Sequence, residues 1–189
     1  MNPCLILVDL QNDYFPGGRM ELMGIAAAAA NAGRLVDHFR RAGSAIIHVQ
    51  HLSVRPGASF FLPETDGAAI NAAVAPREDE PVVVKHYPNA FRATALLEML
   101  HKRGISDVTV CGAMSHMCID ATVRAAFDLG LACTVVEDAC ATTHLTFANR
   151  VIDAADVHAS FMAALSGTYA TVVSTSELTG AQVRTKNAG

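Results

Sequence analysis

Six short runs of apolar, often β-branched residues recur along the chain, and most of them are continuous rather than alternating. Continuous runs of this kind are typical of strands that are covered on both faces. Amphipathic patterns between most of the runs predict helices. The expected strands are 4–10, 44–51, 81–86, 107–114, 132–139 and 168–174, and the expected helices are about 20–41, 92–103, 117–130 and 144–165. This alternation predicts a three-layer α/β/α fold around a central, mostly parallel six-stranded sheet.

Glycines mark the ends of the expected helices. A glycine closely follows each helical pattern, where a helix C-terminal glycine belongs: Gly43, Gly104, Gly130 and Gly167. Residues 52–80 form a long segment rich in Pro and Gly, and long ordered loops are usually functional or interface-forming. No repeat or linker divides the sequence, so we expect a single domain over 1–189 with a frayed polar tail from about 178 to 189.

The composition narrows the class of protein. The 189 residues are 51% hydrophobic and 17% charged, which suits a buried parallel sheet or a large subunit interface. No apolar run reaches the roughly 18 to 20 residues that span a bilayer, and the start of the chain lacks the features of a signal peptide. Lys and Arg are scattered and the net charge is −4. We therefore expect a cytoplasmic protein whose partners include neither membrane nor nucleic acid.

The chain has five cysteines, at positions 4, 111, 118, 133 and 140. An odd number without an export signal predicts reduced thiols in a cytosolic protein. Buried free cysteines usually behave as small apolar residues, and this reading suits four of the five. The spacing of Cys111 and Cys118 is not that of a CxxC motif, so a zinc knuckle or a thioredoxin-like pair is disfavoured.

Polar residues follow the expected strands at the edge where open α/β sheets bind ligands. Asp9 ends the first strand, Lys85 the third, and Cys118 lies just after the fourth. If Ser115 caps the next helix, Cys118 stands in its first turn, where the helix dipole and a nearby lysine would lower the pKa of the thiol. An aspartate could then accept the thiol proton during attack on a carbonyl. Purely structural roles are the alternative to this catalytic interpretation: Asp9 would cap a turn, and Lys85 would be a solvated surface charge.

Four segments, "LILVDLQNDYFPGG", "VVKHYPNAF", "VCGAMSHMCIDATVRAAFDLG" and "VVEDACAT", carry a resemblance over nearly the whole chain. In order, spacing and content they resemble the isochorismatase-like cysteine hydrolases, which include nicotinamidase, N-carbamoylsarcosine amidase and ureidoacrylate amidohydrolase. The resemblance implies a catalytic triad of Asp9, Lys85 and Cys118. It also implies a cis peptide bond between Ala113 and Met114, and an oxyanion hole formed by the N–H groups of Met114 and Cys118.

The substrate pocket is less sharply indicated. The resemblance places Tyr14 in its wall, and position in the sequence adds His86, Phe91 and His116 as candidates. The chain has no Trp, a residue that often walls the nicotinamide pocket of nicotinamidases, so that activity is disfavoured.

A metal site is the open question of the sequence. Where nicotinamidases carry an Asp-x-His metal motif, the chain reads "VQHLS", so His51 and Ser53 stand at the ligand positions. An alternative interpretation makes His48 and His51 a pair of metal ligands, but no third ligand is evident. We expect no metal and no cofactor.

These observations favour a cysteine hydrolase that cleaves a small carboxamide or a ureido or carbamoyl compound through a thioester. The alternatives are a related protein that binds a small ligand without turnover and a redox-sensing thiol. The resemblance and the apolar composition also predict a homo-oligomer, a dimer or a tetramer.

Overall fold

The computed structural model describes residues 3–180 and confirms the predicted fold class. Six parallel strands form one sheet in the order β3-β2-β1-β4-β5-β8. Their bounds are Cys4–Val8 (β1), Ala45–His51 (β2), Val82–Lys85 (β3), Asp107–Ala113 (β4), Ala132–Ala141 (β5) and Thr171–Val173 (β8). The central strands β1 and β4 have side chains that are almost all buried, while the edge strands β3 and β8 are partly exposed.

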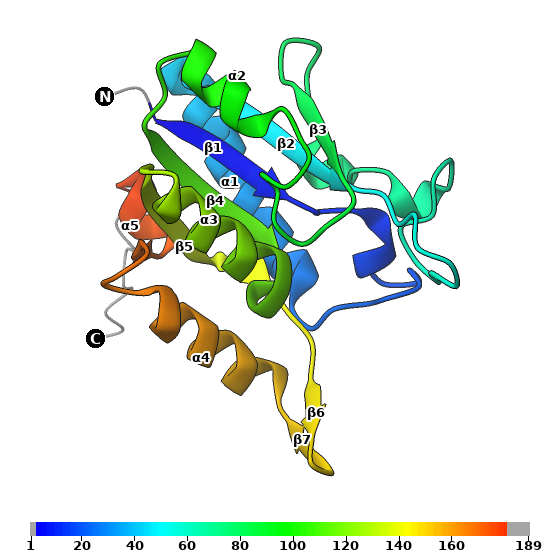
Figure 1. The fold of residues 1–189 in the computed structure, drawn as a ribbon. Coiled ribbons are helices and arrows are strands. Elements are labelled where there is room, and N and C mark those ends of the chain that lie inside the picture. The colour runs from blue at the N-terminus through cyan, green and yellow to red at the C-terminus, as the bar shows by residue number, and fades with distance from the viewer. Residues whose placement is uncertain (1–2, 181–189) are drawn as a thin grey trace, which may run out of the picture.

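Helices cover both faces of the sheet (Figure 1). Helix α1 packs with α5 on one face, while α2, α3 and α4 lie on the other. The helices are Ile25–Ala42 (α1), Leu96–Lys102 (α2), Asp120–Asp128 (α3), Ala154–Leu165 (α4) and Thr175–Thr179 (α5). Short helical turns lie at Asn12–Tyr14 (η1), Asp66–Ala68 (η2), Ala72–Val74 (η3) and Ser115–Ile119 (η4). Gly43 ends α1 in the left-handed conformation that was predicted for it.

One predicted element is wrong. The helix expected over 144–165 begins only at Ala154, and an antiparallel hairpin of β6 (Leu145–Phe147) and β7 (Arg150–Ile152) precedes it. Ala148 and Asn149 at its tip both have positive φ, which suits a two-residue hairpin turn. The hairpin leaves the body of the domain beyond α4 (Figure 1).

The sheet reverses its winding between β1 and β4. Chain order runs outward from β1 through β2 to β3 on one side, and from β4 through β5 to β8 on the other. In open α/β sheets, the crevice at the carboxyl ends of the strands on either side of such a switch is the usual place for a ligand. Asp9 follows β1 there, and Cys118 follows β4.

Gly112 allows the ends of β1 and β4 to come together. Its φ is +127°, and a Cβ atom at this position would collide with the carbonyl oxygen of Val8. The register between β4 and β5 also shifts between Val110 and Gly112. The extra residues of this irregularity lie in β5, between Val135 and Cys140, so it is β5 that is locally distorted beside the end of β4.

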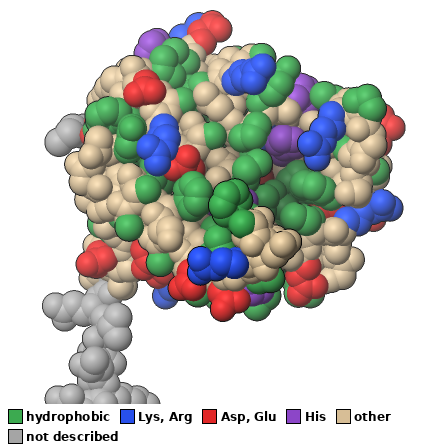
Figure 2. All heavy atoms as spheres, turned by 60° about the horizontal axis from the view of Figure 1, so that its bottom comes forward, with side chains coloured by type: hydrophobic (Ala, Val, Ile, Leu, Met, Phe, Trp, Pro, Cys, Tyr) green, Lys and Arg blue, Asp and Glu red, His purple; other side chains and the backbone are tan. Residues whose placement is uncertain are grey.

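Some apolar side chains remain exposed. Phe147 and Val151 on the hairpin are 77% and 69% exposed. From the hairpin end of the molecule, Figure 2 shows apolar side chains gathered over the middle of the surface, between scattered charged groups. Among residues 3–180, no helix is both long enough and apolar enough to cross a membrane.

Candidate active site

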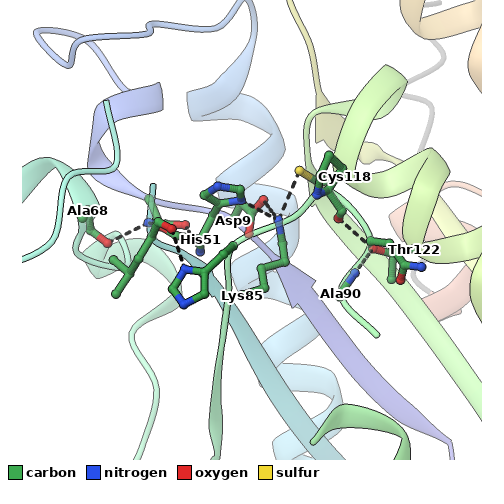
Figure 3. Close-up of polar contacts among 12 residues, drawn as sticks. Asp9, His51, Ala68, Lys85, Ala90, Cys118 and Thr122 are labelled. Carbon is green, nitrogen blue, oxygen red and sulfur yellow. Dashed lines mark hydrogen bonds and ion pairs between the residues drawn. The ribbon is translucent and has the colours of Figure 1, made fainter. Parts of the chain in front are cut away.

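The structure brings Asp9, Lys85 and Cys118 together (Figure 3). Nζ of Lys85 lies 2.7 Å from Oδ2 of Asp9 and donates a hydrogen bond of 3.2 Å to Sγ of Cys118. The side chains of Lys85 and Asp9 are fully buried, and Cys118 is 6% exposed. The three groups predicted to share a site therefore share it, with the ammonium between the carboxylate and the thiol.

Asp9 is held by its backbone. Its φ is +54°, an uncommon conformation that aspartate tolerates better than most side chains. Its N–H donates to the carbonyl of Val49 in β2, and its carbonyl accepts from the N–H of Gln11. Neither carboxylate oxygen has a hydrogen bond of good geometry within the described chain, although Oδ2 is paired in charge with Lys85. The carboxylate is thus anchored and can still accept a proton.

Cys118 lies in a π-helical turn, Ser115–Ile119, that precedes α3. π-Helical turns inside or beside α-helices are frequent at functional sites. The prediction that Ser115 caps the helix is wrong, because Met114 takes the N-cap position and makes no side-chain cap bond. The Ser115 hydroxyl instead donates to the carbonyl of Ala141 and lies 2.8 Å from Nδ1 of His158.

The expected lowering of the Cys118 pKa is also wrong. Burial raises the pKa of this thiol above its ordinary value, and the charge of Asp9 raises it further, while Lys85 lowers it. Burial raises the pKa of Asp9 as well, against the opposing charge of Lys85. Burial thus favours the neutral thiol beside the paired Asp9 and Lys85 side chains, and the thiol must lose its proton during the reaction.

A cavity of about 420 Å³ opens above Cys118. Its wall is mostly apolar and aromatic, and it is lined by Tyr14, His51, Ser53, Val54, Arg55, Phe60, Phe61, His86, Tyr87, Pro88, Met114, Met117 and Cys118. A volume of this size is that of a site for a small molecule. Of the three central residues only Cys118 lines it, and the side chains of Asp9 and Lys85 are fully buried beside it.

The pocket residues predicted from the sequence divide into two pairs. Tyr14 and His86 line the cavity. Phe91 does not, because Ala90 N–H donates to Oγ1 of Thr122 and so draws this segment onto α3. His116 does not either, because its Nδ1 lies 2.6 Å from Oγ1 of Thr142.

Sequence reasoning missed Phe60 and Phe61, which come from the 52–80 segment. Three polar residues of the first motif fix that segment in place. Oδ2 of Asp13 accepts from Phe61 N–H at 2.6 Å, Nδ2 of Asn12 donates to the carbonyl of Asp66, and Nε2 of Gln11 donates to that of Ala68. The sequence feature that could have indicated these two wall residues is therefore the "QNDY" run, whose polar side chains bond to the segment that lines the cavity.

The side chain of His51 contacts that of Lys85 directly. Its Nδ1 lies 2.9 Å from Nζ of Lys85, so the ammonium faces three partners: Asp9, Cys118 and His51. Those three offer ligand atoms that lie within 4.8 Å of one another. Because Lys85 already interacts with all three, this donor set does not fit a metal ion.

His48 does not join that group. Its Nε2 lies 3.1 Å from Oε2 of Glu80, which Arg40 also binds. The two histidines therefore have separate partners, and the metal pair considered from the sequence does not form.

The peptide bond between Ala113 and Met114 is cis. Met114 and Cys118 both line the cavity, on either side of the turn that leads into α3. Their N–H groups remain the proposed oxyanion donors.

Known proteins similar to this chain agree with the fold. The Isochorismatase domain matches residues 3–177. The isochorismatase family protein YddQ of Bacillus subtilis is 50% identical over 93% of this chain and 97% of its own length. A maleamate amidohydrolase of Pseudomonas putida is 30% identical over 75% of this chain and 73% of its own.

Among solved structures, a protein from Oleispira antarctica assigned to the isochorismatase hydrolases superposes with a TM-score of 0.91. It is 47% identical and the alignment covers 95% of this chain and 96% of that one. The chain belongs to the isochorismatase family.

Proposed function

We propose that the protein is a cysteine-dependent hydrolase of a small carboxamide or a ureido or carbamoyl compound. The observation that carries this proposal is the buried ammonium of Lys85 between Asp9 and Cys118, with Cys118 as the one residue of the three that lines an apolar cavity. The amidohydrolase among the relatives supports an amide as the substrate.

The first half-reaction forms a thioester. Asp9 accepts the thiol proton as Sγ of Cys118 attacks the carbonyl carbon, and the carbonyl oxygen becomes an oxyanion that the N–H groups of Met114 and Cys118 stabilise. The tetrahedral intermediate collapses, the C–N bond breaks, and Asp9 returns the proton to the departing nitrogen. Ammonia or an amine leaves, and the acyl group stays on the sulfur.

The second half-reaction repeats the proton transfers with water. Asp9 accepts a proton from water, the hydroxyl attacks the thioester, and the C–S bond breaks to release the acid while the proton returns to the sulfur. Burial opposes the charge of Lys85, but the charge of Asp9 raises the pKa of Lys85, so the lysine remains charged. It stabilises whichever neighbour carries the negative charge.

A screen for ammonia release tests this proposal. Small carboxamides, N-carbamoyl amino acids and ureides are incubated with the wild-type protein and with Cys118→Ala. We expect release from at least one compound class by the wild type and none by the variant. Turnover by folded Cys118→Ala would refute the proposal, and saturable ligand binding with no turnover would favour the non-catalytic alternative.

We further propose a homo-oligomer in a reducing compartment, the cytoplasm. The exposed Phe147 and Val151 of the hairpin support a subunit contact, and the five free cysteines support the compartment. Sedimentation at micromolar concentration should give a dimer or a tetramer, and a monomer would refute the assembly.

A further inference from the structure

His51 is the partner of Lys85 that the mechanism above does not use. It ends β2 and pairs in register with Lys85 of β3, so the two side chains are direct cross-strand neighbours. Gln11 clamps its backbone from both sides: Nε2 donates to the His51 carbonyl at 2.9 Å, and Oε1 accepts from His51 N–H at 2.7 Å. This residue is therefore built into the site and is not a mobile part of the loop that follows it.

The contact with Lys85 decides where the His51 proton is. An ammonium group only donates hydrogen bonds, so Nδ1 of His51, at 2.9 Å, must accept. Burial lowers the pKa of His51 to about 4, and the positive charges of Lys85, His86 and Arg55 act in the same direction. The ring is therefore neutral at neutral pH and carries its single proton on Nε2.

Nε2 of His51 is accessible and has no partner among the described residues. His51 lines the cavity, and Nε2 has no hydrogen-bond partner among residues 3–180. The buried side-chain N and O atoms that lack a partner in this part of the chain belong to Asp9 and His48, so Nε2 is not buried. An accessible N–H donor thus lies on a residue that lines the space in which a substrate would lie.

We propose that His51 positions Lys85 and binds the substrate: Nδ1 accepts the third N–H of the ammonium, and the Nε2–H group donates to an acceptor atom of the bound amide. This inference rests on the proposed function. It narrows the substrates to amides with an oxygen or nitrogen acceptor that reaches Nε2 while the carbonyl carbon lies at Sγ of Cys118.

Nitrogen-15 NMR of the histidine rings tests the proton placement without a substrate. The His51 signals are assigned by their loss in His51→Gln, and we expect the neutral Nε2–H form from about pH 6 to about pH 8. His86 offers an internal contrast, because its Nδ1 lies 2.8 Å from the Leu52 carbonyl and must carry a proton. An Nδ1–H form or a charged ring for His51 at neutral pH would overturn the inference.

Kinetics test its consequence on the best amide from the screen. His51→Phe removes both nitrogens, and we expect kcat to fall about 100-fold because Lys85 loses its fixed position. His51→Gln retains an acceptor and a donor and should recover most of that loss. The exposed His101 offers a matched control, and His101→Phe should keep wild-type kinetics.

The outcomes separate the two proposals. Wild-type kcat and KM in folded His51→Phe, with Cys118→Ala inactive, would refute the role of His51 and leave the cysteine mechanism standing. Turnover by Cys118→Ala would refute the mechanism itself. If His51→Phe fails to fold, an inactive but folded His51→Gln, combined with an Nδ1–H ring in the wild type, would also refute the role of His51.

Discussion

The buried ion pair between Asp9 and Lys85 gives a sharp prediction about stability. The two charged atoms lie 2.7 Å apart and both side chains are fully buried. At an effective dielectric constant of about 20, their attraction is about 6 kcal/mol, and the burial of both charges offsets much of it. Removal of one partner leaves the other charge buried alone, so we expect Lys85→Met to lower the free energy of unfolding by about 3–5 kcal/mol.

The stability that Lys85→Met loses should depend on pH. Without Lys85, the folded-state pKa of Asp9 rises further above its unfolded value, since burial already raises it. A group with a raised folded pKa contributes stability below its unfolded pKa, and that contribution is lost as pH rises through the folded pKa. The deficit of Lys85→Met relative to the wild type should therefore be larger at about pH 8 than at about pH 5.

Urea unfolding at both pH values measures these differences, with two comparisons. The double variant Asp9→Asn/Lys85→Met removes both charges and should recover most of the loss, while it stays inactive. Lys102→Met breaks an exposed pair with Glu98 and should change stability by less than about 0.5 kcal/mol. Wild-type stability of Lys85→Met at about pH 8, or additive losses in the double variant, would refute the reasoning.

Two further predictions concern the support of the site. Gly112→Ala should lower the free energy of unfolding, measured in urea, by more than about 3 kcal/mol, because its Cβ would meet the carbonyl of a β1 residue. The control Gly104→Ala places its Cβ within 4 Å of no other atom and should lower the free energy of unfolding by about 1 kcal/mol. Equal losses in the two variants would contradict this prediction. Glu80→Gln, which weakens the contacts with Arg40 and His48, should cost about 1–3 kcal/mol at neutral pH. Since the folded pKa of Glu80 is lowered from 4.5 to about 2, the wild-type advantage should disappear as pH falls through that window, and a constant difference would contradict it.

The parallel six-stranded sheet and the meeting of Asp9, Lys85 and Cys118 followed from features that a sequence displays. Continuous apolar runs mark buried parallel strands, and the residues after such strands share one edge of the sheet. The pairing of His51 with Lys85 depends instead on the register between β2 and β3, which no local pattern specifies. His51 consequently drew attention as a metal ligand, and its actual partner became visible only in three dimensions.

Other features of the structure were not predicted from the sequence, for different physical reasons. The hairpin before α4 was read as the start of the helix because the pattern over 144–165 contains apolar residues at helical spacing on both sides of Ala148 and Asn149. The raised pKa of Cys118 depends on burial, which overrides the lysine that was expected to lower it. Phe60 and Phe61 lie in a segment without periodicity, and long-range contacts place them at the cavity, among them the hydrogen bond from Phe61 N–H to Asp13 of the "QNDY" run.

The most direct test of the central claim is whether an acyl group passes through Cys118. Hydroxylamine is added during turnover of the best carboxamide, and the hydroxamate and the acid are measured together. The account predicts that hydroxamate forms at the expense of acid as hydroxylamine increases, and that Cys118→Ala forms neither. Full-rate hydrolysis that yields no hydroxamate at any hydroxylamine concentration, or turnover by Cys118→Ala, would contradict it.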